Sequence, residues 1–290
     1  MKLSLALQLG RISNLPTVWS NVLVGALLGG AALGDARLPL VMAAMSLFYI
    51  GGMFLNDAFD REFDAVHRPQ RPIPSGQVSA GEVFAFGLGM LALGLAGLAW
   101  ASRGAGGLPD WRAVAAGAAL AGTIVFYDLH HKDNPLSPLV MGLCRVLVVL
   151  GAAVALTPEL TPPVVFAAAA LLAHLIGLTY IAKQEHLDRL GALWPLGFLA
   201  LPLLYGLALA LADPLVWMPL VLYVGLLAYA LTRLRRRAPG DVPRAVVTLI
   251  AGMSVLDAVL LAGAGQLVAA LLAVAAFWLT LALQRWVAGT

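Results

Sequence analysis

The chain has 290 residues, of which 61% are hydrophobic and 11% are charged, and its mean hydropathy is +0.90. Soluble domains average about 45–50% apolar and about 25% charged residues, so this composition excludes a soluble globular fold and a disordered chain. The single cysteine, Cys144, excludes an internal disulfide. We interpret the net charge of +3 as basic loops beside a membrane rather than as a sign of nucleic-acid binding.

Apolar runs of about 16–22 residues recur along the whole chain, close to the roughly 20 residues that a helical membrane span needs. Helices are expected because lipid cannot satisfy exposed backbone groups. The sequence therefore predicts an all-α integral membrane protein, multi-pass, with one domain over residues 1–290 and nine to ten transmembrane helices. The count stays open because the last two runs nearly touch. The runs are 16–34, 39–56, 81–101, 112–127, 137–156, 161–182, 193–211, 215–232, 245–263 and 266–286.

The basic residues are divided unevenly between the two sides of this predicted topology. With the N-terminus in the cytoplasm, 14 of the 18 lysines and arginines fall on the cytoplasmic side, whereas Arg37, Arg103 and Arg112 fall on the other. Arg145 falls inside the fifth span. This asymmetry follows the positive-inside rule and favours an even number of spans. It places the acidic loops described next in the cytoplasm, and we expect the membrane to be the cell inner membrane.

The loop after the second span is the most polar part of the chain. It contains Asp57, Asp60, Glu62 and Asp64, which are 4 of the chain's 15 acids. If the second helix continues through this loop, positions 57, 60 and 64 share one face, where their charges repel unless cations compensate. Magnesium prefers carboxylate oxygens and is often shared with substrate phosphates, so the spacing suits diphosphate binding through Mg²⁺. The alternative is a solvated helix end whose acids pair with nearby arginines.

The same residues carry a resemblance to a known family. The pattern Asn56-Asp57-x-x-Asp60-x-x-x-Asp64 resembles the first aspartate-rich motif of the UbiA superfamily of intramembrane prenyltransferases, and residues 71–76 (RPIPSG) resemble the segment that trails it. The resemblance implies a helical bundle around a central cavity. It also implies Mg²⁺-dependent ionisation of an isoprenyl diphosphate and transfer of the prenyl group to a small-molecule acceptor. Asp57, Asp60 and Asp64 would then be catalytic, and with Asn56 they would hold the metal.

The family's second motif, Asp-x-x-x-Asp after the sixth span, is altered here. Gln184 and Asp188 occupy its two positions, so glutamine replaces the first aspartate, and Glu185 follows one residue later. Glutamine ligates Mg²⁺ through its carbonyl oxygen but adds no charge. Either Glu185 and Asp188 rebuild a second metal site, with Gln184 contacting substrate, or one metal is held and basic residues take more of the diphosphate.

Basic and aromatic residues on the same side complete the predicted site. The segment from Tyr127 to Lys132 resembles the family's tyrosine-then-basic segment, and we predict that Lys132 contacts the diphosphate as a catalytic residue, because charge develops on the leaving group. The further candidates for substrate binding lie on other loops and spans. They are Arg68, Arg71, Lys183, Tyr127, Tyr180, Asn21 and Arg145.

Polar residues inside a membrane are costly and are usually functional, so those within the spans have separate predictions. The family often has an asparagine near Asn21 that lines the cavity. Arg145 must face the bundle or snorkel, with an interior acid or the diphosphate as its partner. For Asp257 we predict helix–helix hydrogen bonding, and for His174 an interior hydrogen bond.

Two other functions compete with the enzyme. A cation-coupled transporter would place its ionisable groups near the midplane, where His174, Arg145 and Asp257 lie, but the acids of this chain cluster at a membrane face. A non-catalytic homologue that binds a prenyl diphosphate fits the altered second motif. The sequence does not identify the acceptor, which can be aromatic or another polar molecule.

Overall fold

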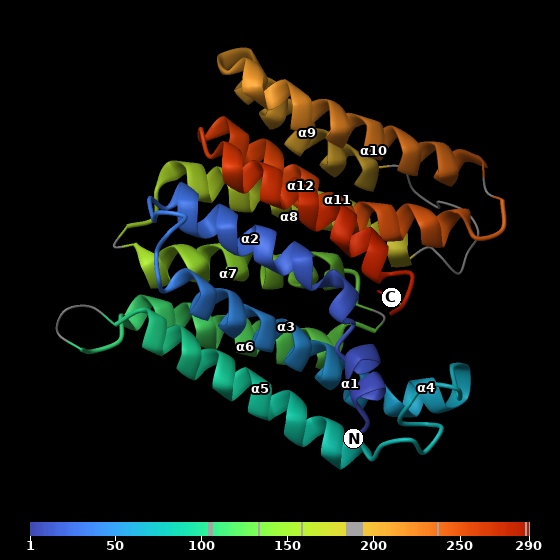
Figure 1. Cartoon of the computed structure of the whole chain (residues 1–290). Helices are drawn as coiled ribbons and strands as arrows, with labels where there is room; N and C mark the ends of the chain where they lie inside the picture. The colour runs from blue at the N-terminus through green and yellow to red at the C-terminus, as the bar shows by residue number, and fades with distance from the viewer. Residues whose placement is uncertain are drawn as a thin grey trace.

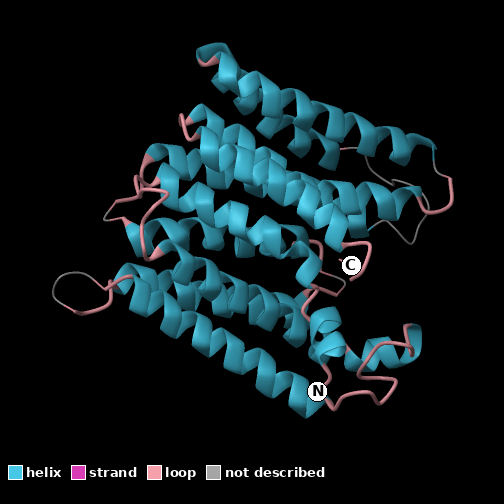
Figure 2. Cartoon of the chain, viewed as in Figure 1, coloured by secondary structure: helices cyan, strands magenta, loops and turns pink. Residues whose placement is uncertain are grey.

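The structure is a computed structural model that describes residues 1–103, 107–132, 134–157, 159–183, 194–236, 238–287 and 289. The elements assigned among these residues are all helical, and Figures 1 and 2 show long helices that lie side by side in a bundle. In chain order they are α1 (Leu3–Leu9), η1 (Ile12–Asn14), α2 (Leu15–Leu28), α3 (Leu38–Phe59), α4 (Arg61–His67), α5 (Ala80–Ala101), α6 (Trp111–His130), α7 (Ser137–Leu156), α8 (Pro162–Lys183), α9 (Pro195–Ala212), η3 (Pro214–Val216), α10 (Trp217–Arg236), α11 (Asp241–Gly263) and α12 (Leu267–Leu283).

Seven helices among the described residues are long and apolar enough to cross a bilayer, and the prediction of an all-helical membrane protein is confirmed. Three shorter apolar helices, over Ile12–Leu28, Gly197–Ala212 and Leu267–Leu283, correspond to the first, seventh and tenth predicted runs. The first run is shorter than predicted because α2 ends at Leu28 and not near residue 34. Gly30, with φ of 101°, takes the left-handed backbone that ends helices.

Helix α11 lies at the centre of one half of the bundle. In its most apolar stretch, 83% of the residues are buried inside the protein, and it contacts α2, α8, α9, α10 and α12. In the other half, α2 packs on α7, α7 on α6 and α8, and α3 on α5. The α2–α7 approach depends on Gly25, because a Cβ there would lie 2.1 Å from the carbonyl oxygen of Val149. Small residues that let backbones approach closely are typical of helix packing in membranes.

The connections gather at two ends of the bundle. The α3–α4 junction, the turn from α6 to α7 and the turn from α10 to α11 lie at one end, on the right in Figure 1, together with α1. The loops 29–37 and 107–110 lie at the other end. The acidic motif and the basic segment that follows α6 therefore meet at the same end of the molecule, although they are far apart in sequence.

Candidate functional site at the α3–α4 end

The acidic motif lies on a break between two helices. Helix α3 ends at Phe59, Asp60 lies at the junction, and α4 begins at Arg61. The backbone of Asp60 remains near helical values, so Asp64 follows on the next turn. Asp57 is 8% exposed and Asp64 is 2% exposed, and buried carboxylates of this kind need paired charges or hydrogen bonds. The burial of these two acids does not fit a solvated helix end, although the pairing with an arginine that the same alternative expected is present.

Asp57 and Asp64 are bridged by one arginine. Nη1 of Arg71 lies 2.9 Å from Oδ1 of Asp57 and 3.2 Å from Oδ2 of Asp64. The loop returns to the helix end through a turn, in which the amide of Ser75 donates to the carbonyl of Arg71 and Gly76 has φ of 74°. The structure therefore brings Arg71 to the acids, which is the pairing that the alternative of a helix end expected, and the contact of Arg71 with a diphosphate stays a prediction.

Arg11 is a second cation on Asp57, and sequence reasoning did not assign it to the site. Its Nη2 lies 3.3 Å from Oδ1 of Asp57, and its carbonyl accepts a hydrogen bond of 3.2 Å from the hydroxyl of Tyr49. The backbone of Arg11 has φ of 42°, a left-handed conformation that costs roughly 1–3 kcal/mol for a residue with a side chain. Such strain is maintained where surrounding contacts hold the residue, and here those contacts reach α3.

Asp60 has different partners from the end of α6. Nζ of Lys132 lies 2.7 Å from its Oδ1, and Nε2 of His131 lies 3.4 Å from its Oδ2. Burial raises the pKa of Asp60, but the hydrogen bonds from His131 and Lys132 outweigh that effect and hold the pKa below its usual value. Burial likewise lowers the pKa of His131, while the hydrogen bond to Asp60 and its charge raise it above the ordinary value. Asp60 is therefore an acid whose ionised form is favoured by the ammonium of Lys132 and the imidazole of His131.

Asn56 connects the motif to a buried acid on α6. Its amide donates a hydrogen bond of 3.1 Å to Oδ1 of Asp128, which is 5% exposed. The other oxygen of Asp128, Oδ2, is buried and has no hydrogen-bond partner among the residues that the structure describes. Sequence reasoning quoted Asp128 but gave it no role, although an acid in the last turn of an apolar helix was a signal.

A cavity of about 90 Å³ lies beside this pair, between α3, α6, α7 and α2. Tyr127 and Asp128 lie in its wall near the end of α6, and Arg145 and Tyr49 lie in its wall farther along α7 and α3. The remaining wall is largely apolar, with Gly52, Phe48, Ile124 and Val148 among the lining residues. The acidic cluster therefore lies next to a mainly apolar cavity inside the bundle.

Three polar side chains form a chain of hydrogen bonds across the bundle interior. Nη1 of Arg145 donates to Oδ1 of Asn21 at 3.2 Å, and Nδ2 of Asn21 donates to Oδ2 of Asp257 at 2.7 Å. The prediction of helix–helix hydrogen bonding for Asp257 is therefore confirmed. His174 also has the interior role predicted for it, because its ring nitrogens lie 2.8 Å from the hydroxyl of Tyr223 and 2.9 Å from the carbonyl of Leu249.

The other predicted substrate residues are placed less closely. Arg68 is exposed, and Lys183 is the last residue of α8. The hydroxyl of Tyr180 donates to the carbonyl of Pro135 at 3.0 Å, so Tyr180 lies beside the α6–α7 turn. Gln184, Glu185 and Asp188 lie outside the described residues.

The side chains at this end include oxygen atoms of the kinds that bind a divalent cation. Carboxylate oxygens of Asp57, Asp60 and Asp64 and the amide oxygen of Asn56 are ligands that Mg²⁺ prefers. Within the described ranges, no three His, Cys, Asp or Glu side chains are close enough together to hold a metal ion, because basic groups separate the acids. The residues fit the chemistry of Mg²⁺, and a bound cation would take the place of one or more of these basic partners.

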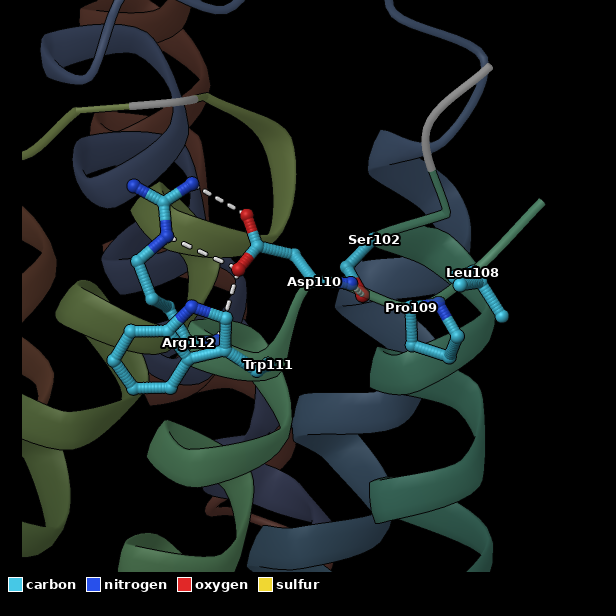
Figure 3. A pocket seen from close by; sticks show the side chains of 6 residues that line it. All are labelled: Ser102, Leu108, Pro109, Asp110, Trp111 and Arg112. Atoms are coloured by element: carbon cyan, nitrogen blue, oxygen red, sulfur yellow. Dashed lines mark hydrogen bonds and ion pairs between the residues drawn. The ribbon is translucent and has the colours of Figure 1, made fainter. Parts of the chain in front are cut away.

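A second hollow lies at the opposite end of the bundle. It has a volume of about 570 Å³, is open, and is lined by Ser102 and residues 108–112. Figure 3 shows the carboxylate of Asp110 turned to the guanidinium of Arg112, two positions along the chain. The side chains of Leu108 and Trp111 are largely exposed, at 79% and 75%. This hollow lacks the converging acids and bases of the α3–α4 end.

Comparison with known proteins agrees with the arrangement of the helices and the motif. Residues 18–247 match the model of the UbiA prenyltransferase family. Digeranylgeranylglyceryl phosphate synthase of Methanopyrus kandleri is 35% identical over 210 residues, which is 71% of this chain and 71% of that protein. The synthase of the same name from Ignicoccus hospitalis is 42% identical over 101 residues, which is 34% of this chain and 32% of that protein.

Two solved structures share the fold. One, from a structural study of digeranylgeranylglyceryl phosphate synthase in membranes, has a TM-score of 0.64 at 20% identity and covers 90% of this chain and 98% of its own. The apo structure of a UbiA homologue from Aeropyrum pernix K1 has a TM-score of 0.52 at 21% identity, with coverages of 94% and 95%. The predicted resemblance is confirmed, and with it the enzyme is favoured over a transporter. The chain belongs to the UbiA prenyltransferase family and is a membrane-embedded prenyltransferase.

Proposed function

We propose that this prenyltransferase moves a prenyl group from an isoprenyl diphosphate to a hydroxyl oxygen of a glycerophosphate acceptor. The observation that carries the proposal is the alternation of acids, buried or half-buried, with basic groups at the α3–α4 end, beside an apolar cavity. Binding of a diphosphate uses both kinds of side chain. The basic groups and Mg²⁺ bind its oxygens, and the acids hold these positive charges in place. The acceptor class rests on the relatives, which are named for a glyceryl phosphate product.

The donor's diphosphate binds against the acidic motif. Asn56, Asp57, Asp60 and Asp64 would hold Mg²⁺, with Glu185 and Asp188 as further ligands from the second motif. When bound, the cation supplies charge neutralisation on the diphosphate oxygens. Arg71, Lys132 and Arg11 supply fixed positive charge in addition, at the point where negative charge grows as the leaving group departs. Arg68, Lys183 and Gln184 contact the diphosphate from the loops.

The transfer breaks the bond between C1 of the prenyl group and the diphosphate oxygen, and the diphosphate leaves with the electron pair. The acceptor oxygen forms the new bond to C1 and loses its proton to an oxygen of the departing diphosphate. Tyr127 and Tyr180 lie near the two loops and orient the substrates. The apolar walls of the cavity exclude water, which would otherwise capture the reactive allylic centre.

The site faces the cytoplasm in this proposal. Fourteen basic residues of the chain belong to the side that carries the acidic motif in the predicted topology, and positive loops remain in the cytoplasm. In a bacterial or archaeal cell this places the enzyme in the inner, cytoplasmic membrane, where a soluble diphosphate product is released into the cell.

The test uses the purified full chain with geranylgeranyl diphosphate, monogeranylgeranylglyceryl phosphate and Mg²⁺. We expect stoichiometric release of diphosphate and formation of a doubly prenylated lipid, and loss of both with EDTA. Asp60→Asn is expected to abolish both signals, whereas Asp35→Asn, at the opposite end, retains them. Diphosphate release that survives Asp60→Asn, or no transfer to the glycerophosphate by the unaltered chain, would contradict the proposal.

A further inference from the structure

Arg145 is a charged side chain buried inside a membrane-spanning helix. It is 9% exposed and lies about two turns inside α7, about 12 Å from the first residue of the helix at a rise of 1.5 Å per residue. An arginine at this depth costs about 3 kcal/mol or more, and such residues usually pair with another group or line a pathway. Burial at that cost needs a partner for the charge.

The partners present in the protein satisfy Arg145 incompletely. A guanidinium carries several N–H donors. In the part of the chain that the structure describes, it donates one hydrogen bond, from Nη1 to Asn21 at 3.2 Å. Its other contact is with the ring face of Tyr49, at 5.3 Å from the ring centroid. Asp257 is the nearby acid, but Asn21 stands between the two, since its amide donates to Asp257 at 2.7 Å.

The guanidinium adjoins open space. Arg145 lines the cavity of about 90 Å³, several times the roughly 10–15 Å³ that holds one water molecule. Asp128 lines the same cavity and reaches the acidic motif through its hydrogen bond with Asn56. The cavity therefore has a cationic group in one part of its wall and an acid in another, with apolar side chains between them.

We propose that this cavity receives the anionic group of the acceptor and that Arg145 binds it. The inference rests on the proposed function, under which that group is the phosphate of a glycerophosphate. The anion belongs at Arg145 because Arg145 is the cationic group among the residues that line this cavity. A hydroxyl elsewhere on the acceptor then points toward the α3–α4 end, where the prenyl diphosphate binds. Asn21 is a positioning residue, held by Asp257 so that its carbonyl oxygen fixes the guanidinium.

The test measures equilibrium binding and does not need turnover. Dissociation constants of monogeranylgeranylglyceryl phosphate and of neutral monogeranylgeranylglycerol are measured on the unaltered chain and on Arg145→Gln in lipid nanodiscs. The unaltered chain is expected to bind the phosphate form at least about tenfold more tightly, the scale of one hydrogen bond to a charged group. Arg145→Gln should lose this preference, while the affinity for geranylgeranyl thiodiphosphate stays within about twofold.

Matched controls separate the role of Arg145 from general damage. Arg37→Gln removes an arginine from the opposite end and should keep the preference for the phosphate form. Thermal unfolding with and without geranylgeranyl thiodiphosphate reports whether Arg145→Gln is folded. If that variant does not fold, the unaltered chain alone still tests the inference. Equal affinities of the unaltered chain for the anionic and the neutral acceptor would overturn it.

A third ligand distinguishes failure of the acceptor class from failure of the site. If the unaltered chain binds 4-hydroxybenzoate and not the glycerophosphate, the proposed acceptor class is wrong. Loss of 4-hydroxybenzoate binding in Arg145→Gln would then support Arg145 as the anion site for a carboxylate. A folded Arg145→Gln that keeps its affinity for whichever anionic acceptor the unaltered chain binds would overturn the inference.

Discussion

At the end of the bundle away from α4, acids pair with arginines two positions along the chain, Asp35 with Arg37 and Asp110 with Arg112. At the α3–α4 end, Asp57 pairs with Arg11 at a separation of 46 residues, and Asn56 binds Asp128 at a separation of 72. Local pairs of the first kind form wherever a short loop turns. Pairs of the second kind exist only when several helices are assembled, so they mark the end where the fold brings charges together.

The comparison predicts unequal losses for the same substitution at the two ends. Asp64→Asn removes a buried charge that shares Arg71 with Asp57, and we expect prenyl transfer to fall by about 100-fold or more, the scale of losing one group that stabilises developing charge. Asp110→Asn, the matched control, should leave transfer within about twofold, because exposed pairs contribute about 0–1 kcal/mol. Initial rates of diphosphate release measure both. Equal losses would remove the distinction between the ends.

Lys132 sharpens the comparison on the basic side. Its ammonium lies 2.7 Å from Asp60 and 4.0 Å from the ring centroid of Phe63. We expect Lys132→Met to lower kcat by about 10–100-fold, with a smaller change in KM, because the charge is needed most as the leaving group departs. Lys2→Met, at an exposed position, is the control. A rise in KM alone would assign Lys132 to ground-state binding.

Arg71 tests whether one bridging arginine is required. Arg71→Lys keeps the charge but loses the planar group whose Nη1 contacts Asp57 and Asp64 together. We expect transfer to fall by about tenfold, since one bridging contact of roughly 1.4 kcal/mol is lost. Arg37→Lys should change transfer little. Full activity of Arg71→Lys, measured at saturating Mg²⁺, would show that charge alone suffices at this position.

The smallest expected effect is on acid stability at the opposite end. The hydrogen bond from Arg37 holds the pKa of Asp35 below its ordinary value, and the hydrogen bond from Arg112 does the same for Asp110. A lowered pKa gives stability that is present above the ordinary pKa and is lost as pH falls through the lowered one. Asp35→Asn with Asp110→Asn should therefore lower Tm slightly at pH 6 and converge with the unaltered chain once the pH falls below the lowered pKa values of Asp35 and Asp110. A difference that persists in acid would contradict the sign.

The sequence predicted the helices and the acidic motif because both are local patterns. Apolar runs of membrane length identify the helices, and the end of α2 was missed because Gly29 and Gly30 lie inside an apolar run. The acids at 57, 60 and 64 were expected on one face, but the structure gives Asp60 partners that differ from those of Asp57 and Asp64. This difference in partners depends on where α6 ends relative to α3. No local sequence pattern specifies that position.

Contacts between polar residues that are far apart in the chain could not be predicted from the sequence. Arg11 reads as an ordinary basic residue before the first span, and its contact with Asp57 requires α1 to lie against α3. The chain from Arg145 through Asn21 to Asp257 joins residues separated by 124 and 236 positions. Each polar residue was recognised as costly in a membrane, but their connection follows from the packing of α2 on α7 and α11.

The most direct measurement is a crystal structure of the full chain with Mn²⁺ and geranylgeranyl thiodiphosphate, which resists hydrolysis. The account predicts an anomalous Mn²⁺ peak coordinated by oxygens of Asp57, Asp60 or Asp64, with the diphosphate against Arg71 and Lys132 and with Glu185 or Asp188 facing it. A peak beside Asp35 or Asp110, or a diphosphate bound away from the α3–α4 end, would contradict it.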